Sequence, residues 1–181
     1  MNSANVFLSI LLIAYLATPV IADVESATDQ GITVKTSVTV PGTPEDAWKH
    51  LLNLGTWWSS AHTWSGDAAN LSITAEPGGR FEEKLPGGGF ARHMDVVYCQ
   101  PGKILRMTGA LGPLQESAAQ GTMTIVLSKE DDTTTITTTY HLGGYFSGGW
   151  KNIAPIVDKV ITEQFQRLGQ RIEGTLKETN P

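Results

Sequence analysis

The chain has 181 residues and a formal net charge of −5, from 18 acidic and 13 basic side chains. This acidic balance, without any run of Lys or Arg, argues against a nucleic-acid partner, because faces that bind DNA or RNA are basic. A hydrophobic content of 40% excludes a disordered chain, and the single cysteine, Cys99, excludes internal disulfides and cysteine-based zinc fingers.

The first 22 residues predict a secretory signal peptide. Residues 6–16 are almost wholly apolar, and Val20 and Ala22 are small residues at the −3 and −1 positions before Asp23. A retained membrane anchor is the alternative, but the apolar stretch contains Pro19 and is shorter than the roughly 20 residues of a membrane span. We expect cleavage after Ala22, a periplasmic or secreted protein of about 160 residues, which is one domain, and no stable membrane association after cleavage.

Residues 23–30 are expected to form a flexible segment before the first regular element. Residues 31–40 alternate between apolar and polar side chains, which predicts a strand with one buried face. A helix start follows, with Thr43 as the N-cap, Pro44 at the first helical position and Asp46 three residues after the cap. A second short helix followed by a loop is expected within residues 56–67, which hold Trp57, Trp58 and Trp64.

Six further strands and one long helix complete the predicted elements. The strands are expected at residues 71–75, 80–85, 90–99, 103–111, 121–129 and 133–142, and the short turns between them predict a sequential antiparallel meander. A final amphipathic helix is expected over residues 151–175. Such a helix spans roughly 36 Å and a nine-residue strand roughly 30 Å, so one helix can cover a curved sheet. Because one helix cannot fill the whole concave face, we expect an internal cavity for a small apolar molecule.

Several short segments carry a family resemblance, namely Val40-Pro41 with Glu45-Asp46-Ala47-Trp48, residues 54–58, residues 76–83, residues 100–106, Leu142-Gly143-Gly144-Tyr145 and residues 158–168. In this order they resemble the helix-grip superfamily of START domains, the birch-pollen allergen and polyketide cyclases (SRPBCC). The branch that looks nearest is the polyketide cyclase/dehydrase and heat-shock-ATPase-activator-homologue group.

The resemblance implies an α+β helix-grip fold over residues 31–175, with residues 176–181 as a tail. It implies a curved antiparallel sheet of about seven strands wrapped around the long C-terminal helix, with two short helices after the first strand and a cavity inside. The superfamily includes lipid carriers, hormone receptors and aromatase/cyclases, so the fold alone does not fix an activity.

Glu83 is the candidate catalytic residue. Phe81, Glu83 and Leu85 alternate onto one face of a strand, and since two of the three are apolar, Glu83 is expected to point inward. A buried carboxylate is costly unless it protonates or finds a partner. A raised pKa would suit a general acid or base, whereas a partner such as a cavity Arg, Trp or Tyr would make the residue structural or ligand-orienting.

Alternation places some of the other polar residues. Tyr140 is expected to face inward, and Arg106, between two core residues, outward, while the direction of His93 stays open. Tryptophans from the short helix and the loop after it would close the cavity mouth, opposite Tyr145. The expected ligand-binding residues are Trp57, Trp58, Trp64, Phe81, Glu83, His93, Met107, Tyr140, Tyr145 and Phe165.

Two functions of different class are consistent with these residues. The favoured one is an exported protein that binds a hydrophobic, aromatic or lipid-like small molecule, and the alternative is a cyclase/dehydratase-type enzyme with Glu83 as general acid or base, helped by Tyr140 or His93. The four histidines lack the HxH or HxxxH spacing of a metal site, and no dinucleotide-binding or phosphate-loop signature is present, so we expect neither metal nor cofactor. The oligomeric state is left open.

Overall fold

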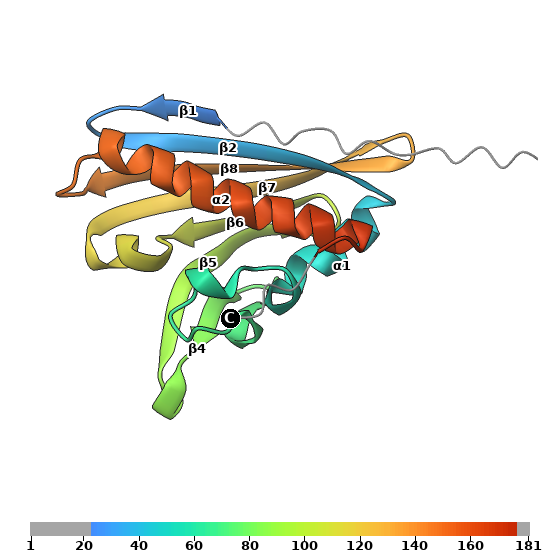
Figure 1. The fold of residues 1–181 in the computed structure, drawn as a ribbon, viewed down its shortest axis with the longest axis horizontal. Coiled ribbons are helices and arrows are strands. Elements are labelled where there is room, and N and C mark those ends of the chain that lie inside the picture. The colour runs from blue at the N-terminus through green and yellow to red at the C-terminus, as the bar shows by residue number, and fades with distance from the viewer. Residues whose placement is uncertain (1–22, 177–181) are drawn as a thin grey trace, which may run out of the picture.

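The computed structural model describes residues 23–176 (Figure 1). The predicted signal peptide and residues 177–181 of the predicted tail lie outside this range. Within it, none of the helices has both the length and the apolar character needed to cross a membrane.

Eight strands form one antiparallel sheet in the order β1-β2-β8-β7-β6-β5-β4-β3. The strands are β1 (Asp23–Ala27), β2 (Gly31–Pro41), β3 (Leu71–Ile73), β4 (Arg80–Lys84), β5 (Phe90–Gln100), β6 (Ile104–Gly109), β7 (Ala118–Glu130) and β8 (Thr133–Tyr145). Strands β3 to β8 form the predicted meander, in which each strand pairs with the next along the chain. β2 then adds to the free side of β8, with Gly31 opposite Gly143 and Pro41 opposite Thr133.

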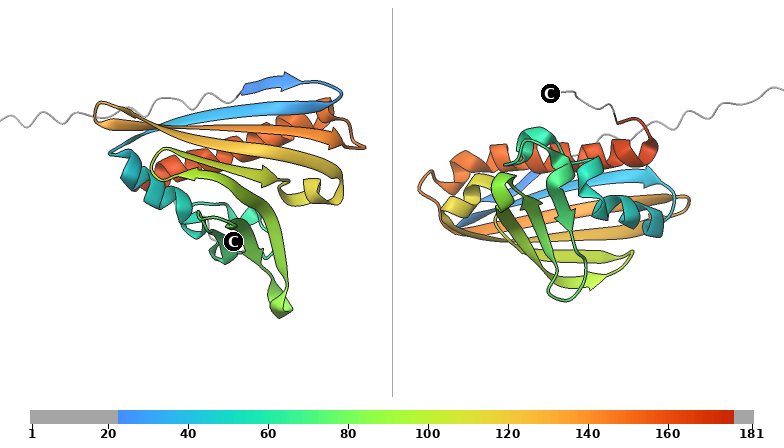
Figure 2. Two further views of the ribbon diagram at one scale, coloured as in Figure 1. Left: turned by 180° about the vertical axis from the view of Figure 1, so that it is seen from behind. Right: turned by 90° about the horizontal axis from the view of Figure 1, so that it is seen from below.

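The two α-helices lie at the positions that the sequence predicts. α1 (Pro44–Leu52) begins at Thr43, whose hydroxyl accepts the N–H of Asp46 at 3.2 Å, and α2 (Trp150–Glu173) runs along β2 on the inner face of the sheet (Figures 1 and 2). The second short helix is only a 3₁₀ turn, η1 (Leu54–Thr56). Further turns of this kind are η2 (Ser60–His62), η3 (Ala68–Asn70), η4 (Pro86–Gly88) and η5 (Gly112–Glu116). The architecture is the expected helix-grip arrangement.

The segment before β2 is more regular than we predicted. Residues 23–27, expected to be flexible, form β1, which pairs with β2 through contacts such as Val24 opposite Val34. Val24 and Ala27 pack against the hydrophobic core. The sheet therefore has eight strands rather than about seven, because even a short segment gains backbone hydrogen bonds when it pairs along a sheet edge.

The core fills the space between α2 and the inner face of the sheet. Trp57 and Phe165 are each 1% exposed, and their ring centroids lie 5.9 Å apart. Met107, on β6, is also 1% exposed. Side chains fill the interior around Trp57 and Phe165, and the unfilled space lies along the first half of α2.

Candidate ligand cavity

An apolar cavity of about 350 Å³ lies between α2, the inner faces of β4, β5 and β8, and two loops. Aliphatic side chains of α2 form one wall, and the aromatic rings of Trp58, Phe81 and Tyr140 form another. The sides are closed by residues 111–114, at the start of η5, and by residues 61–64, in the last part of η2 and just after it. A concave, mostly apolar space of this size is typical of small-molecule sites.

Half of the residues expected to bind ligand line this cavity: Trp58, Trp64, Phe81, His93 and Tyr140. The others lie elsewhere. Met107 is buried on β6, which contributes no residue to the cavity wall, so inward parity does not guarantee a place there. Trp57, just after η1, and Phe165, in the second half of α2, are buried in the core instead. Tyr145 is 71% exposed, and Glu83 is fully buried behind the wall.

Two parts of the lining were not predicted from the sequence. Residues 111–114 were expected to be a strand end and a turn, yet they form part of the wall. Ile153, Ile156 and Val160 line the cavity from the first half of α2. Helical spacing marked Ile153 and Val160, but not Ile156, as part of an apolar stripe, and only the packing of α2 decides which part of α2 meets empty space rather than the sheet.

A β-bulge directs His93 into the cavity wall. Phe81 pairs with Met94 and Glu82 pairs with Arg92, so His93 is an extra residue without a partner on β4. Both His93 and Met94 are buried as a result, although they are neighbours in sequence. Bulges commonly re-aim a side chain in this way, which explains why alternation could not decide the direction of His93.

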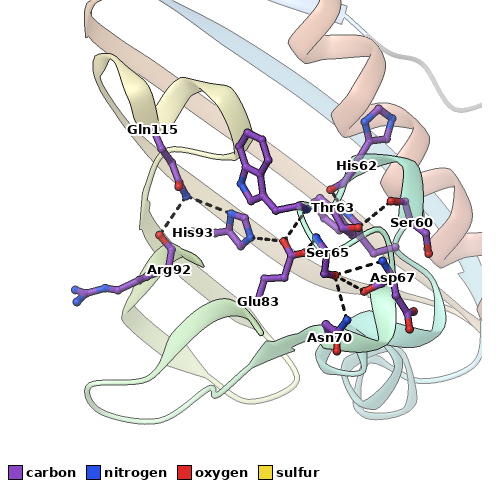
Figure 3. A network of polar contacts seen from close by, with 12 residues as sticks. Ser60, His62, Thr63, Ser65, Asp67, Asn70, Glu83, Arg92, His93 and Gln115 are labelled. Atoms are coloured by element: carbon purple, nitrogen blue, oxygen red, sulfur yellow. Dashed lines mark hydrogen bonds and ion pairs between the residues drawn. The ribbon is translucent and has the colours of Figure 1, made fainter. Parts of the chain in front are cut away.

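The carboxylate of Glu83 accepts three hydrogen bonds, shown in Figure 3. One oxygen accepts the backbone N–H of Ser65 at 2.5 Å, and the other accepts the backbone N–H of Trp64 at 3.1 Å and the Nε2–H of His93 at 3.2 Å. Trp64 and Ser65 belong to the loop between η2 and η3, which forms the mouth of the cavity. Glu83 therefore joins β4, the bulge of β5 and this loop.

The partners of His93 define its protonation state. The amide nitrogen of Gln115 donates to the backbone carbonyl of Arg92 at 3.1 Å and to Nδ1 of His93 at 3.2 Å (Figure 3). Because the Arg92 carbonyl only accepts, it fixes the amide group as the donor, and Nδ1 must then be an acceptor. His93 is therefore neutral, with its proton on Nε2 facing Glu83.

The pKa directions agree with a neutral histidine beside an ionised carboxylate. Burial raises the pKa of Glu83, but the hydrogen bonds from Ser65, Trp64 and His93 outweigh it and hold this pKa below its ordinary value. Burial lowers the pKa of His93, and the hydrogen bond and charge of Glu83 only partly oppose that shift. An ionised Glu83 cannot donate a proton, so the raised pKa required of a general acid is not found.

The hydroxyl of Tyr140 is also engaged within the protein. It donates to the carbonyl of Gly109 and accepts the N–H of Leu111, both at 3.3 Å. Burial raises the pKa of this hydroxyl well above its ordinary value. Tyr140 thus offers its ring to the cavity, while its oxygen holds the connection between β6 and η5.

The mouth of the cavity has a mixed rim. The half-exposed indole of Trp64 lies in the loop held by Glu83, and His62 pairs with Glu163 of α2 at 3.3 Å. Ile156, which is 58% exposed, lies on α2 at the same opening. Arg106 contributes nothing here, because its guanidinium lies over the exposed ring of Tyr98. In residues 23–176, no three His, Cys, Asp or Glu side chains gather in an arrangement that could hold a metal ion.

A family model described as polyketide cyclase / dehydrase and lipid transport matches residues 31–173. The chain belongs to this family. The match covers the whole helix-grip domain from β2 to the end of α2, including the cavity, Glu83 and His93. No relative was found among curated proteins.

Solved structures share the fold at low sequence identity. CalU16 from Micromonospora echinospora is 11% identical with a TM-score of 0.58, and the alignment covers 90% of this chain and 88% of that protein. Protein MLL2253 from Mesorhizobium loti is 18% identical with a TM-score of 0.57, over 79% and 98% of the two chains. The di-domain ARO/CYC StfQ of the steffimycin biosynthetic pathway is 13% identical with a TM-score of 0.56, over 81% of this chain and 52% of StfQ.

Proposed function

We propose that this family member binds one hydrophobic small molecule, aromatic or lipid-like, in its cavity. The observation that carries this proposal is the state of the buried polar groups at the cavity wall. His93 uses both ring nitrogens, and the Tyr140 hydroxyl both donates and accepts within the protein. Apolar contact is therefore the main interaction left for a ligand, and each square ångström of apolar surface removed from water contributes about 25 cal/mol.

The side chains that line the cavity are suited to an apolar ligand that is either flat or flexible. The rings of Trp58, Phe81 and Tyr140 form one side of the cavity, and aliphatic side chains of α2 form the other. Aromatic side chains supply large contact areas and favour stacking or edge-to-face contact with other rings. The family description, which names lipid transport, is consistent with such a ligand.

We further propose that the protein acts outside the cytoplasm, after cleavage at Ala22. The support is the apolar N-terminal stretch with its small residues before Asp23. Expression of the full chain in its own host, followed by fractionation and N-terminal sequencing, tests this. A first residue of Asp23 outside the cytoplasm is expected, and an intact Met1 in the membrane fraction would instead indicate an anchor.

The alternative function is a cyclase/dehydratase-type reaction with Glu83 as the acid or base. Its support is the family description, the ARO/CYC neighbour and the position of Glu83 one hydrogen bond behind His93. In that case Glu83→Gln abolishes turnover while binding of the substrate changes little. The binding function is favoured because the ionised Glu83 has no direct access to the cavity, and His93 has no free nitrogen there.

Native mass spectrometry of the protein purified from its own host tests the binding function. A bound molecule that is lost on denaturation is expected, and its mass defines the ligand class. Titration with a fluorescent apolar probe provides a second measurement, since Trp58 and Trp64 line the cavity and their emission reports occupancy. Failure to find a co-purified ligand and failure of every apolar probe to bind would together refute the proposal.

A further inference from the structure

His93 separates two hollows of different character. On one side is the apolar cavity, and on the other is a polar groove of about 340 Å³ lined by Arg92, Asp95, Thr108, Gln115, Ser117 and Gln120, among others. Among the described residues, His93 is the one that lines both spaces. A ligand that reached past His93 would therefore pass from an apolar to a polar environment.

The groove exists because the sheet has a gap at this point. β6 ends at Gly109, opposite Met94 of β5 and Gly121 of β7. β5 extends back to Phe90 and β7 begins at Ala118, so both continue past the end of β6. Residues 110–117 close the gap, with residues 111–114 facing the apolar cavity and Gln115 facing the polar groove.

Gln115 is an exposed side chain that lies beside His93, where the apolar cavity and the polar groove meet; we call this place the junction. Its amide nitrogen is shared between the Arg92 carbonyl and Nδ1 of His93 (Figure 3). Because the side chain is exposed, water can replace these bonds when it moves away, so its displacement from His93 is inexpensive compared with that of a buried group.

The chemistry at the junction selects for a donor. Glu83 holds the proton of His93 on Nε2, so Nδ1 presents a lone pair. We propose that the ligand is amphipathic, with an apolar body in the cavity and a hydroxyl head, alcoholic or phenolic, that replaces Gln115 at Nδ1 of His93 and lies in the polar groove. An ether or an ionised carboxylate cannot donate this hydrogen bond. This inference rests on the proposed binding function and adds the class of ligand.

A matched pair of probes tests the head group. 2-Naphthol and 2-methoxynaphthalene share their ring system and an oxygen, but only the naphthol donates a hydrogen bond. The quantity measured is the ratio of their dissociation constants, by tryptophan fluorescence and calorimetry. In the wild-type protein, the naphthol is expected to bind more tightly, but by less than the roughly 2- to 10-fold value of one hydrogen bond, because it must displace the amide of Gln115 from Nδ1.

Two variants locate the effect at the junction. Gln115→Ala removes the competing donor from Nδ1 and is expected to raise the preference for naphthol to the full value of one hydrogen bond, about 2- to 10-fold. Gln120→Ala, at another exposed position of the groove, is the matched control and is expected to leave the ratio unchanged. His93→Phe keeps an aromatic wall without an acceptor and is expected to abolish the preference.

The outcomes separate this inference from the proposed function. If both probes bind with equal affinity and Gln115→Ala leaves their ratio unchanged, the hydroxyl inference is wrong and the apolar-binding function stands. If neither probe binds to the wild-type protein, the hydroxyl inference is overturned, and the binding function falls with it when no ligand co-purifies and no other apolar probe binds. Because Gln115 lies on the surface, its alanine variant is expected to fold, so the ratio can be measured even where His93→Phe is unstable.

Discussion

Replacement of Glu83 by Gln provides the sharpest test of how the cavity wall is held together. Glu83 accepts hydrogen bonds from Ser65 on one oxygen and from Trp64 and His93 on the other. Gln has one acceptor oxygen and one NH₂ group. In its better orientation, the oxygen keeps Trp64 and His93, and the NH₂ group faces the N–H of Ser65.

The expected loss follows from these three contacts. Two donors that face each other in a buried site cost about 1–3 kcal/mol, and the two remaining hydrogen bonds lose the strengthening that a charged acceptor provides. Together we expect Glu83→Gln to lower the free energy of unfolding by about 2–4 kcal/mol, a large part of the 5–15 kcal/mol typical of a domain. At an ordinary m-value, the urea midpoint falls by about 1–2 M.

Urea unfolding followed by tryptophan fluorescence measures the loss, and Glu82→Gln is the matched control. Glu82 is the half-buried neighbour of Glu83 on β4, and its variant is expected to stay within about 0.5 kcal/mol of the wild-type protein. Hydrogen exchange of the Ser65 amide gives a local measurement, and it should be faster in Glu83→Gln. A Glu83→Gln protein as stable as the Glu82→Gln protein, with an equally protected Ser65 amide, would refute the reasoning.

Acid provides a second test of the same contacts, because it removes the charge of Glu83 in the wild-type protein. Since the pKa of Glu83 is lowered in the folded protein, its contribution is complete above its ordinary value of 4.5 and is lost as the pH falls through the lowered pKa. The difference in stability between the wild-type protein and Glu83→Gln should therefore shrink in this acidic range. A difference that stayed constant there would show that ionisation of Glu83 is not involved.

Three further predictions concern the cavity and the bulge. Because burial lowers the pKa of His93, the free energy of unfolding should fall as the pH drops below its ordinary value of 6.5, and His93→Phe should flatten this part of the profile measured by urea unfolding. Val160→Phe fills the cavity and should weaken binding of an apolar probe about tenfold or more. Val126→Phe, on the exposed face of β7, is the control and should leave the affinity unchanged. If the two variants bind the probe equally well, the ligand binds elsewhere. Gly109→Ala should destabilise the fold by more than about 2 kcal/mol, because its φ is +153° and a Cβ there would lie 2.3 Å from the His93 carbonyl oxygen. Gly66→Ala, with a φ of +77° and open space, should cost only about 1 kcal/mol, and thermal unfolding compares the two.

The sequence predicted most of the architecture because its signals are local. Alternation marked β2, the Thr43 cap marked the start of α1, and apolar spacing marked α2. β1 was missed because its stability comes from pairing with β2, and the residues of β1 alone carry no pattern that predicts this pairing. The second short helix was overestimated, since η1 gains only one 3₁₀ turn before Trp57 and Trp58 turn into the core.

The site was harder to predict because its key contacts join distant segments. Parity correctly placed Glu83 on the inner face, but its backbone partners at Trp64 and Ser65 depend on the path of a loop that no periodicity describes. The direction of His93 depends on a bulge, which shifts the register by one residue. The place of Gln115 depends on where β6 ends, and neither its type nor its spacing pointed to the cavity.

The pairing of β2 with β8 also has a consequence for the order in which the chain can assemble. Residues near position 31 cannot find their partners near position 143 until more than a hundred further residues have been synthesised. The meander from β3 to β8 can form from local hairpins, whereas closure of this long loop costs about 2 kcal/mol more in chain entropy than closure of a ten-residue hairpin. Until β8 is available, β2 and the inner face of the sheet remain exposed to solvent. The chain is therefore most prone to aggregation, and most dependent on a chaperone, in this interval.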